Sequence, residues 1–143
     1  NKVWVVDFIF STCQNICSPM TYAMKDINDS LKNLGDKVVF LSFSIDPTHD
    51  TPSVLKKYKE AHQISAKNWY FLTGGDQEQI NQFAINQFLV FATADKDAPG
   101  GFAHSQNFIL VDKDRHVRGI YDGLTDKGRN GLIEGVKTLL NKR

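Results

Sequence analysis

The chain contains two cysteines, Cys13 and Cys17, with only three residues between them. Thiols this close usually serve redox or metal chemistry; the alternative is a chance pair of small buried side chains. The pair follows an apolar run and opens an expected helix, so Cys13 should lie in a loop and Cys17 in the first helical turn. Residues four apart at a helix start lie within disulfide range, and the free N–H groups there favour thiolates. The two side chains can therefore cycle between dithiol and disulfide, or hold a soft metal ion such as Cu(I) or zinc.

The strands that must position these cysteines are predicted from runs of β-branched and aromatic residues. The longest runs are apolar on both faces, which is typical of strands buried in a covered sheet. The last two runs flank "KDRH", a polar turn of hairpin length. The predicted strands are Val3–Phe10, Val38–Ile45, Trp69–Leu72, Asn107–Asp112 and Val117–Tyr121.

Four helices are predicted between and after these strands. The first spans about Pro19–Leu34, and the second begins at Thr51-Pro52, where a capping hydroxyl precedes a proline at the first helical position. The third starts near Asp76, and the fourth lies near the carboxyl end of the chain. The apolar faces of these last two helices are formed by Ile80, Phe83 and Ala84, and by Leu132, Ile133, Val136, Leu139 and Leu140.

The order of these elements predicts an α/β fold with parallel crossovers and an antiparallel edge. This is a thioredoxin-like, three-layer layout, in which a central mixed sheet is flanked by helices. One connection, Phe88–His104, is long and interrupted by Pro99-Gly100-Gly101. It is either a functional loop or an ordinary surface insertion with a small hairpin.

Length and composition indicate a single domain over residues 1–143 and exclude several classes of protein. The hydrophobic fraction of 41% is sufficient for a packed core. Lys and Arg (17) balance Asp and Glu (16), so no basic stripe indicates a nucleic-acid partner. No apolar run approaches the roughly 18 residues of a membrane span, and the first residues carry no signal pattern. The protein is thus either soluble or has lost an address segment.

Spacing separates the chain from two families that share the predicted layout. Thioredoxins have two residues between their cysteines and a cis-proline before the hairpin, whereas this chain has three residues there and "AHSQN" (103–107) before the hairpin. Peroxiredoxins place a proline and a threonine upstream of the reactive cysteine, where this chain has Phe8-Ile9-Phe10.

Four stretches in the same order resemble another family with this layout, the SCO/SenC proteins. They are "FIFSTCQNICSPMT", "SFSIDPTHDTPSVLKKY", "NWYFLTG" and "HSQNFILVDKDRHVRGIYDG", and together they cover most of the chain. SCO/SenC proteins are thioredoxin-like copper chaperones that serve cytochrome c oxidase assembly. The chain departs from the family pattern at Gln14 and Ser18, where proline is usual, and at Ala103, where aspartate is frequent.

The resemblance implies a copper site made by Cys13, Cys17 and His104, which binds Cu(I) or Cu(II). It also implies that Cys13 and Cys17 act as a redox pair on the binuclear copper site of the oxidase. The implied partners are the copper-site subunit of cytochrome c oxidase and other copper chaperones or thiol oxidoreductases. The implied location is extracytoplasmic, on the periplasmic side of a bacterial membrane, with an N-terminal anchor and a first β segment preceding residue 1.

The remaining histidines are weaker candidates than His104, whose soft imidazole would complete a site of two sulfurs and one nitrogen. His49 belongs to a polar turn near the end of a central strand, from which it could approach the site. His62 ends a helix, and His116 lies in the hairpin turn.

Two further pairs of side chains allow more than one interpretation. Met20 and Met24 continue the helical spacing of the cysteines, and a core stripe is favoured over a thioether ligand. Asp46 and Asp50 are expected to cap the following helix, with a role near the metal or in partner docking as the alternative.

Three functions are compatible with these residues. The leading hypothesis is a metal-binding assembly factor that delivers copper to, or maintains the thiols of, the oxidase copper site. The second is a general extracytoplasmic thiol–disulfide oxidoreductase or redox sensor, in which one thiol attacks and the other resolves. A structural zinc site is the weakest, because only three ligands are available and a fourth is needed.

Overall fold

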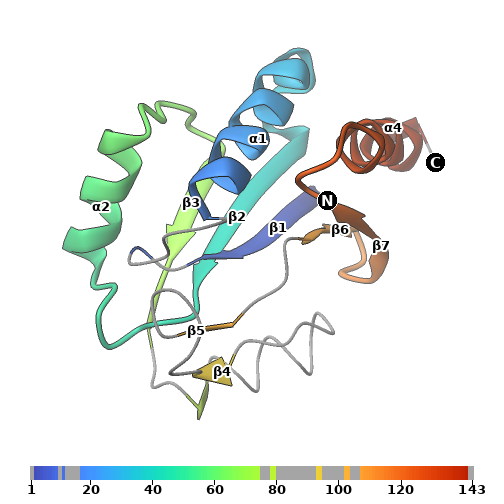
Figure 1. The fold of residues 1–143 in the computed structure, drawn as a ribbon. Helices are drawn as coiled ribbons and strands as arrows, with labels where there is room; N and C mark the ends of the chain where they lie inside the picture. Colours follow the sequence, from blue (N-terminus) through green and yellow to red (C-terminus); the bar gives the residue numbers. More distant parts are fainter. Residues whose placement is uncertain are drawn as a thin grey trace.

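A five-stranded mixed sheet forms the centre of the molecule, with strand order β3-β2-β1-β6-β7 (Figure 1). The computed structural model describes residues 2–9, 11, 17–74, 78–79, 93–94, 102–103 and 107–141. β1 pairs in parallel with β2, and β2 with β3, whereas β6 and β7 extend the sheet antiparallel. The strands span β1 Val3–Ile9, β2 Val38–Ser44, β3 Trp69–Leu72, β6 Asn107–Val111 and β7 Val117–Asp122. The five predicted strands, the parallel crossovers and the antiparallel edge are confirmed.

The first predicted helix differs from the observed one at both ends. α1 spans Cys17–Ser30, so Pro19 lies in its first turn, where the N–H that proline lacks would have no helical partner. After α1, the N–H of Leu31 bonds to the carbonyls of both Ile27 and Asn28, and a 3-10 segment, η1, spans Lys32–Lys37. A tightened last turn of this kind is common at helix ends and shortens the α-helix relative to the predicted span.

The later helices agree with the sequence where they are described. α2 (Pro52–Ala61) begins after Thr51, whose hydroxyl accepts from the N–H of Val54 at 3.3 Å. α4 spans Asp126–Asn141 and buries Leu132, Val136 and Leu139. Of the helix predicted near Asp76, only the helical residues 78–79 are described, and its apolar face lies outside the described residues. In the long connection, β4 (Thr93–Ala94) pairs antiparallel with β5 (Phe102–Ala103). A small hairpin belongs to one of the two alternatives predicted for this connection, and the pairing alone does not decide between a functional loop and a surface insertion.

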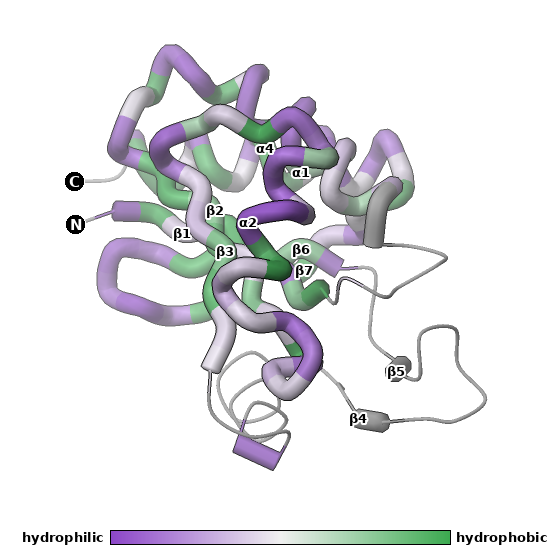
Figure 2. The backbone as a smooth tube through the Cα atoms, turned by 90° about the vertical axis from the view of Figure 1, so that its left-hand side faces the viewer, coloured by the Kyte–Doolittle hydropathy of each residue, from purple (hydrophilic) through white to green (hydrophobic). Residues whose placement is uncertain are grey.

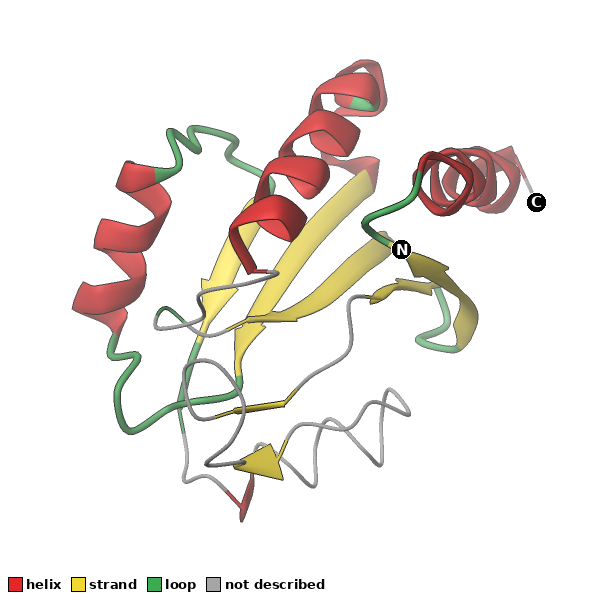
Figure 3. Ribbon diagram, viewed as in Figure 1, coloured by secondary structure: helices red, strands yellow, loops and turns green. Residues whose placement is uncertain are grey.

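α1 and α4 pack on the same face of the sheet, as Figure 3 illustrates, and α2 lies beside the outer strand β3. Side chains at alternate positions along the strands form two apolar clusters, and hydrophobic residues are frequent in the central strands β1, β2 and β6 (Figure 2). The cluster under α1 and α4 includes Val3, Val5, Met20, Met24, Phe40, Phe108, Leu132 and Val136. The second cluster includes side chains on the opposite face of the sheet and contains Val6, Phe8, Val39, Leu41, Leu55, Tyr58 and Ile109. Together these clusters fix the sheet and α1, the elements that lead to the cysteines.

α4 approaches the hairpin closely through its glycines. A Cβ at Gly128 would clash with the backbone oxygen of Asp122, and a Cβ at Gly135 would lie 2.7 Å from the hydroxyl oxygen of Tyr121. A Cβ at Gly131 would lie 3.2 Å from the same ring. The glycines therefore provide the space in which Tyr121 and the end of β7 contact α4.

Candidate functional site

The carboxyl ends of β1 and β2 lie side by side, and α1 begins at Cys17 near this edge (Figure 1). Ile9 is in register with Ser44, and the N–H of Ile45 donates to the carbonyl of Ile9 at 2.9 Å. Ligand sites in α/β sheets commonly lie at this edge. The prediction that Cys17 lies in the first helical turn is confirmed. Cys13 and His104 lie outside the described residues, so the three-ligand set stays a prediction.

Asp50 is a completely buried carboxyl group at this edge, and it accepts three hydrogen bonds. Ser11 donates twice, from its backbone N–H to Oδ2 at 3.0 Å and from its hydroxyl to Oδ1. Ser44 donates its hydroxyl to Oδ2 at 2.8 Å. Because Thr51 is the cap of α2, the prediction that Asp46 and Asp50 cap this helix is wrong.

Asp46 is also buried, at the start of the same turn. Its backbone carbonyl accepts from the N–H groups of His49 and Asp50, at 3.1 and 2.8 Å, and its own N–H donates to the hydroxyl of Ser44. Burial and the neighbouring charge of Asp50 raise the pKa of Asp46, against smaller opposing effects of the His49 ring and backbone N–H. Two carboxyl groups are thus held close together at the edge of the sheet.

A second buried polar cluster lies between the sheet and α1. The hydroxyl of Ser42 donates to Oδ1 of Asp7 at 2.5 Å and accepts from the indole N–H of Trp69 at 3.0 Å. The Ser42 oxygen also lies 3.8 Å from the sulfur of Met24 on α1. Asp7, completely buried, stands six positions before Cys13 in the sequence, on the strand that leads to it.

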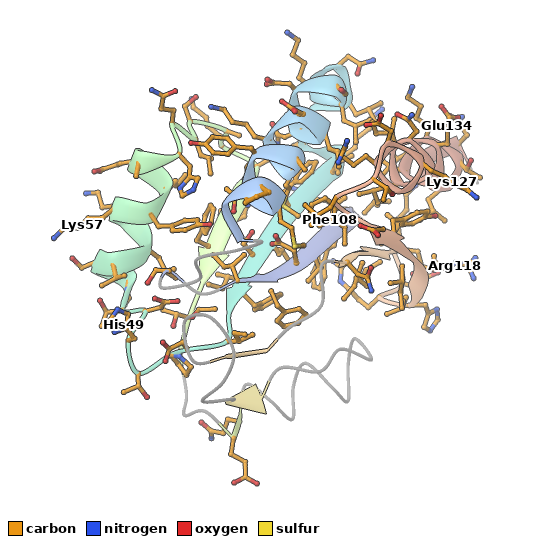
Figure 4. All side chains as sticks on the ribbon, in the orientation of Figure 1. His49, Lys57, Phe108, Arg118, Lys127 and Glu134 are labelled. Carbon is orange, nitrogen blue, oxygen red and sulfur yellow. The ribbon has the colours of Figure 1, made fainter. Side chains whose placement is uncertain are left out.

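Met20 and Met24 are completely buried in the core, which confirms the core interpretation of this pair. The three described histidines lie where they were predicted. His49 is exposed in the turn after β2, beyond the strand's end (Figure 4), and His116 is exposed in the hairpin turn. His62 follows the last residue of α2, where its ring lies 4.1 Å from that of Tyr58 and its Nδ1 lies 2.8 Å from the Tyr58 carbonyl.

Two negative findings apply to the described part of the chain. There, no group of three or more His, Cys, Asp or Glu side chains is arranged to hold a metal ion. Among the same residues, no helix combines the length and apolar character that a membrane crossing requires.

Sequence reasoning missed the roles of Ser11 and Ser44 at this edge, and the pair Asp7–Ser42 between the sheet and α1. One signal was available. Ser11 and Asp50 each follow a strand of the predicted parallel pair, and the carboxyl ends of such strands meet at one edge.

The chain is similar to several proteins of one family along most of its length. A SCO1 protein homolog of Bacillus subtilis is 36% identical over 137 residues, which are 96% of this chain and 70% of that protein. The structure of a SCO1/SenC family lipoprotein from Bacillus anthracis has a TM-score of 0.89 at 33% identity, covering 98% of this chain and 82% of the other.

Two further solved structures are similar to the chain along most of its length. BsSco, a member of the Sco family of cytochrome c oxidase assembly proteins in which a disulfide switch was identified, has a TM-score of 0.86 at 35% identity, covering 99% of this chain and 82% of its own. Yeast Sco1, solved with copper bound, has a TM-score of 0.74 at 26% identity, covering 96% and 77%. The family model described as SCO1/SenC matches residues 1–141. The fold, the alignments over nearly all of the chain and this match show that the chain belongs to the SCO1/SenC family.

Proposed function

We propose that this protein binds one copper ion through Cys13, Cys17 and His104 and serves the assembly of the copper site of cytochrome c oxidase. The observation that carries the proposal is the start of α1 at Cys17, beside the carboxyl ends of β1 and β2. Free backbone N–H groups and the helix dipole stabilise a thiolate at such a position. The copper bound by yeast Sco1, a relative at 26% identity, supports the choice of metal.

The chemistry of the donor set fits copper as a cargo. The two thiolates are soft ligands that suit Cu(I) better than hard cations, and imidazole also binds copper well. The carboxyl group of Asp50, the fully buried acid at the same edge, accepts three hydrogen bonds from Ser11 and Ser44. Copper held by thiolates would pass to a partner's cysteines by exchange of one ligand at a time.

Substitution of His104 tests the proposed ligand set. We expect His104→Ala to lower copper affinity by at least about tenfold, because one of three ligands is lost, while thiol–disulfide exchange by the cysteines is retained. Affinity is measured by competition with a Cu(I) chelator on the fully reduced protein, and exchange by the rate with a small disulfide. His49→Ala is the matched control, since His49 is exposed in the turn after β2 and is not a proposed ligand. Copper binding by His104→Ala as tight as that of the parent would contradict the three-ligand site.

A second candidate function is thiol–disulfide exchange, either as a reductant of the oxidase copper site or as a redox sensor. It is favoured by the disulfide switch of BsSco, at 35% identity. In this reaction one thiolate attacks a partner's disulfide and the other displaces the partner from the mixed disulfide. Turnover on disulfides by the metal-free protein, with no copper retained, would favour this function. A very low reduction potential would fit a reductant or a stable disulfide rather than an oxidant.

The proposed partner is the copper-site subunit of cytochrome c oxidase, with other copper chaperones or thiol oxidoreductases as further candidates. The proposed location is the extracytoplasmic side of a bacterial membrane, where an N-terminal anchor would hold this single domain near the oxidase. The Bacillus anthracis relative, described as a lipoprotein, supports an anchored location.

A further inference from the structure

The hydrogen bonds of Asp50 join two segments that are distant in the sequence. Ser11 and Asp50 are separated by 39 positions, and Ser11 immediately precedes the segment that carries Cys13. The backbone N–H of Ser11 donates to one carboxyl oxygen of Asp50 and its hydroxyl donates to the other. A two-point contact of this kind fixes both the backbone and the side-chain rotamer of Ser11.

The burial of Asp50 makes this contact hard to break. Its side chain is completely buried, so a donor removed from the carboxyl group is not replaced by bulk water. Asp50 is itself held by Ser44 at the end of β2, and its N–H donates to the carbonyl of Asp46. These hydrogen bonds therefore hold the turn after β2 in one conformation. Ser11, in the chain that leaves β1, is hydrogen-bonded to this turn.

α1 supplies the second fixed point. Met20 and Met24, in its first two turns, are completely buried against the sheet, and this packing holds the helix that begins at Cys17. The chain from Ser11 to Cys17 thus starts and ends at anchored residues. A short segment with both ends fixed loses less entropy when two groups along it are brought together.

We infer that Asp50 is a positioning residue for the cysteine pair: through its two hydrogen bonds to Ser11 it fixes the start of the segment that carries Cys13 and so raises the effective concentration of the two thiols toward each other. The inference rests on the redox and metal-binding role proposed for Cys13 and Cys17. Asp50 touches neither cargo nor partner in this role, and it acts on the cysteines only through Ser11.

The alternative is that Asp50 only stabilises the turn after β2. The two roles can be separated because the carboxyl group has two kinds of donor. Ser44→Ala removes a donor from Asp50 on the side of the turn and leaves Ser11 untouched. Ser11 donates one hydrogen bond to each carboxyl oxygen of Asp50. Asp50→Asn replaces one of these two acceptor oxygens by an amide nitrogen, so one of the two bonds is lost. If Asp50 has only a structural role, both variants should lose stability. If it positions the cysteines, the dithiol–disulfide equilibrium should change mainly in Asp50→Asn.

To test the inference, the metal-free protein is equilibrated with reduced and oxidised glutathione. The quantity measured is the fraction of protein that contains the Cys13–Cys17 disulfide. In this reaction the two thiols give two electrons and two protons to oxidised glutathione, which yields one protein disulfide and two reduced glutathiones. We expect Asp50→Asn to shift this equilibrium toward the dithiol by about tenfold, and Ser44→Ala by less than about twofold. Ser11→Ala, which loses only the hydroxyl bond, should shift it by about threefold, and Ser11→Thr should restore it.

Alkylation of Cys13 by iodoacetamide, in a Cys17→Ser background, gives a second measure that needs no disulfide. Released from its anchor, Cys13 should react several-fold faster in Asp50→Asn than in Ser44→Ala. Circular dichroism and urea unfolding verify that each variant is folded; if Asp50→Asn does not fold, the comparison of Ser11→Ala with Ser44→Ala decides.

The outcomes separate this inference from the proposed function. If the parent protein retains no copper but the Ser11 and Asp50 variants still shift the thiols, the copper assignment fails and the positioning role stands. Equal thiol behaviour in the Ser44, Ser11 and Asp50 variants would overturn the positioning role, whether or not copper binds.

Discussion

Two turns of this molecule are built from similar residues and have opposite electrostatics. The turn after β2 reads "DPTHD" (46–50), and the turn between β6 and β7 reads "DKDRH" (112–116). Each begins with an aspartate within two residues of the end of a strand. Each also contains a second aspartate and a histidine. We refer to them as the edge turn and the hairpin turn.

In the hairpin turn, the leading aspartate is surrounded by donors. Oδ1 of Asp112 accepts from the N–H groups of Asp114 and His116, each at 2.9 Å, and Oδ2 lies 3.1 Å from Nε of Arg118. The backbone N–H of His116, with that of Asp114 and the charges of His116 and Arg118, lowers the pKa of Asp112, although desolvation opposes them.

In the edge turn, the leading aspartate is buried beside a second carboxyl group. Burial and the charge of Asp50 raise the pKa of Asp46. The difference shows that two turns of similar composition can shift the pKa of their leading aspartate in opposite directions, because burial is the largest effect at Asp46 and a backbone N–H donor is the largest at Asp112. It also shows that ionising Asp46, which is buried beside Asp50, costs free energy at the edge of the sheet where α1 and the segment with Cys13 begin.

Ser44→Ala should have the largest effect on stability, because it removes the hydroxyl that links both acids of the edge turn. Ser44 is completely buried, donates to Asp50 and accepts from the N–H of Asp46 at 3.0 Å. We expect the free energy of unfolding to fall by about 1–3 kcal/mol, measured by urea denaturation. Ser53→Ala, at an exposed position of α2, is the matched control and should change it by less than about 0.5 kcal/mol. Similar losses in both variants would mean that the edge turn is not held by these hydrogen bonds.

Asp46→Asn should have an intermediate effect that depends on pH. A raised pKa means that the folded state holds the Asp46 proton more tightly than the unfolded state. The resulting stability is complete at low pH and is lost as pH rises through the folded pKa. Asparagine cannot ionise beside Asp50, so the variant should lack this decline and should gain on the parent as pH rises. Urea midpoints across the acidic to neutral range measure the effect, and a constant difference between variant and parent would contradict the assignment.

Asp112→Asn should have the smallest effect, and the opposite sign at neutral pH. A lowered pKa gives stability that is present above the ordinary pKa of an aspartate and is lost as pH falls through the folded value. The variant should therefore be slightly less stable than the parent near neutrality and equal to it in strong acid. Added salt should reduce the difference, because the contact with the exposed Arg118 is screened. A loss that salt leaves unchanged would mean that the charge of Asp112 is not involved.

Much of the fold could be predicted from local residue types. The strands were identified from β-branched and aromatic runs such as Val3–Phe10, observed as Val3–Ile9, and the start of α2 was identified from Thr51-Pro52. Both succeed because a strand or a helix cap is a property of a few neighbouring residues. The parallel crossovers and the antiparallel edge of the sheet followed from the alternation of strands and helices along the chain and from the final hairpin.

The candidate site was less predictable, because its contacts depend on register between distant strands. Asp50 was assigned to a helix cap, but the pairing of β1 with β2 brings it to Ser11, and Thr51 takes the cap. The hydrogen bond between Asp7 and Ser42 follows from the same pairing, since these two residues are in register. Cys17 lies where it was expected, and the roles of Cys13 and His104 stay predictions.

The glycines of α4 have a consequence for how the hairpin β6–β7 and α4 fold. Gly128, Gly131 and Gly135 each disfavour a helix by about 1 kcal/mol relative to alanine, so the segment has little helical tendency by itself. Its helicity is supplied by the surface it touches, where Tyr121 and the end of β7 fit against these bare positions. Hairpin and helix should therefore open and close as one cooperative unit, and fraying of the β7 end would unwind α4 with it.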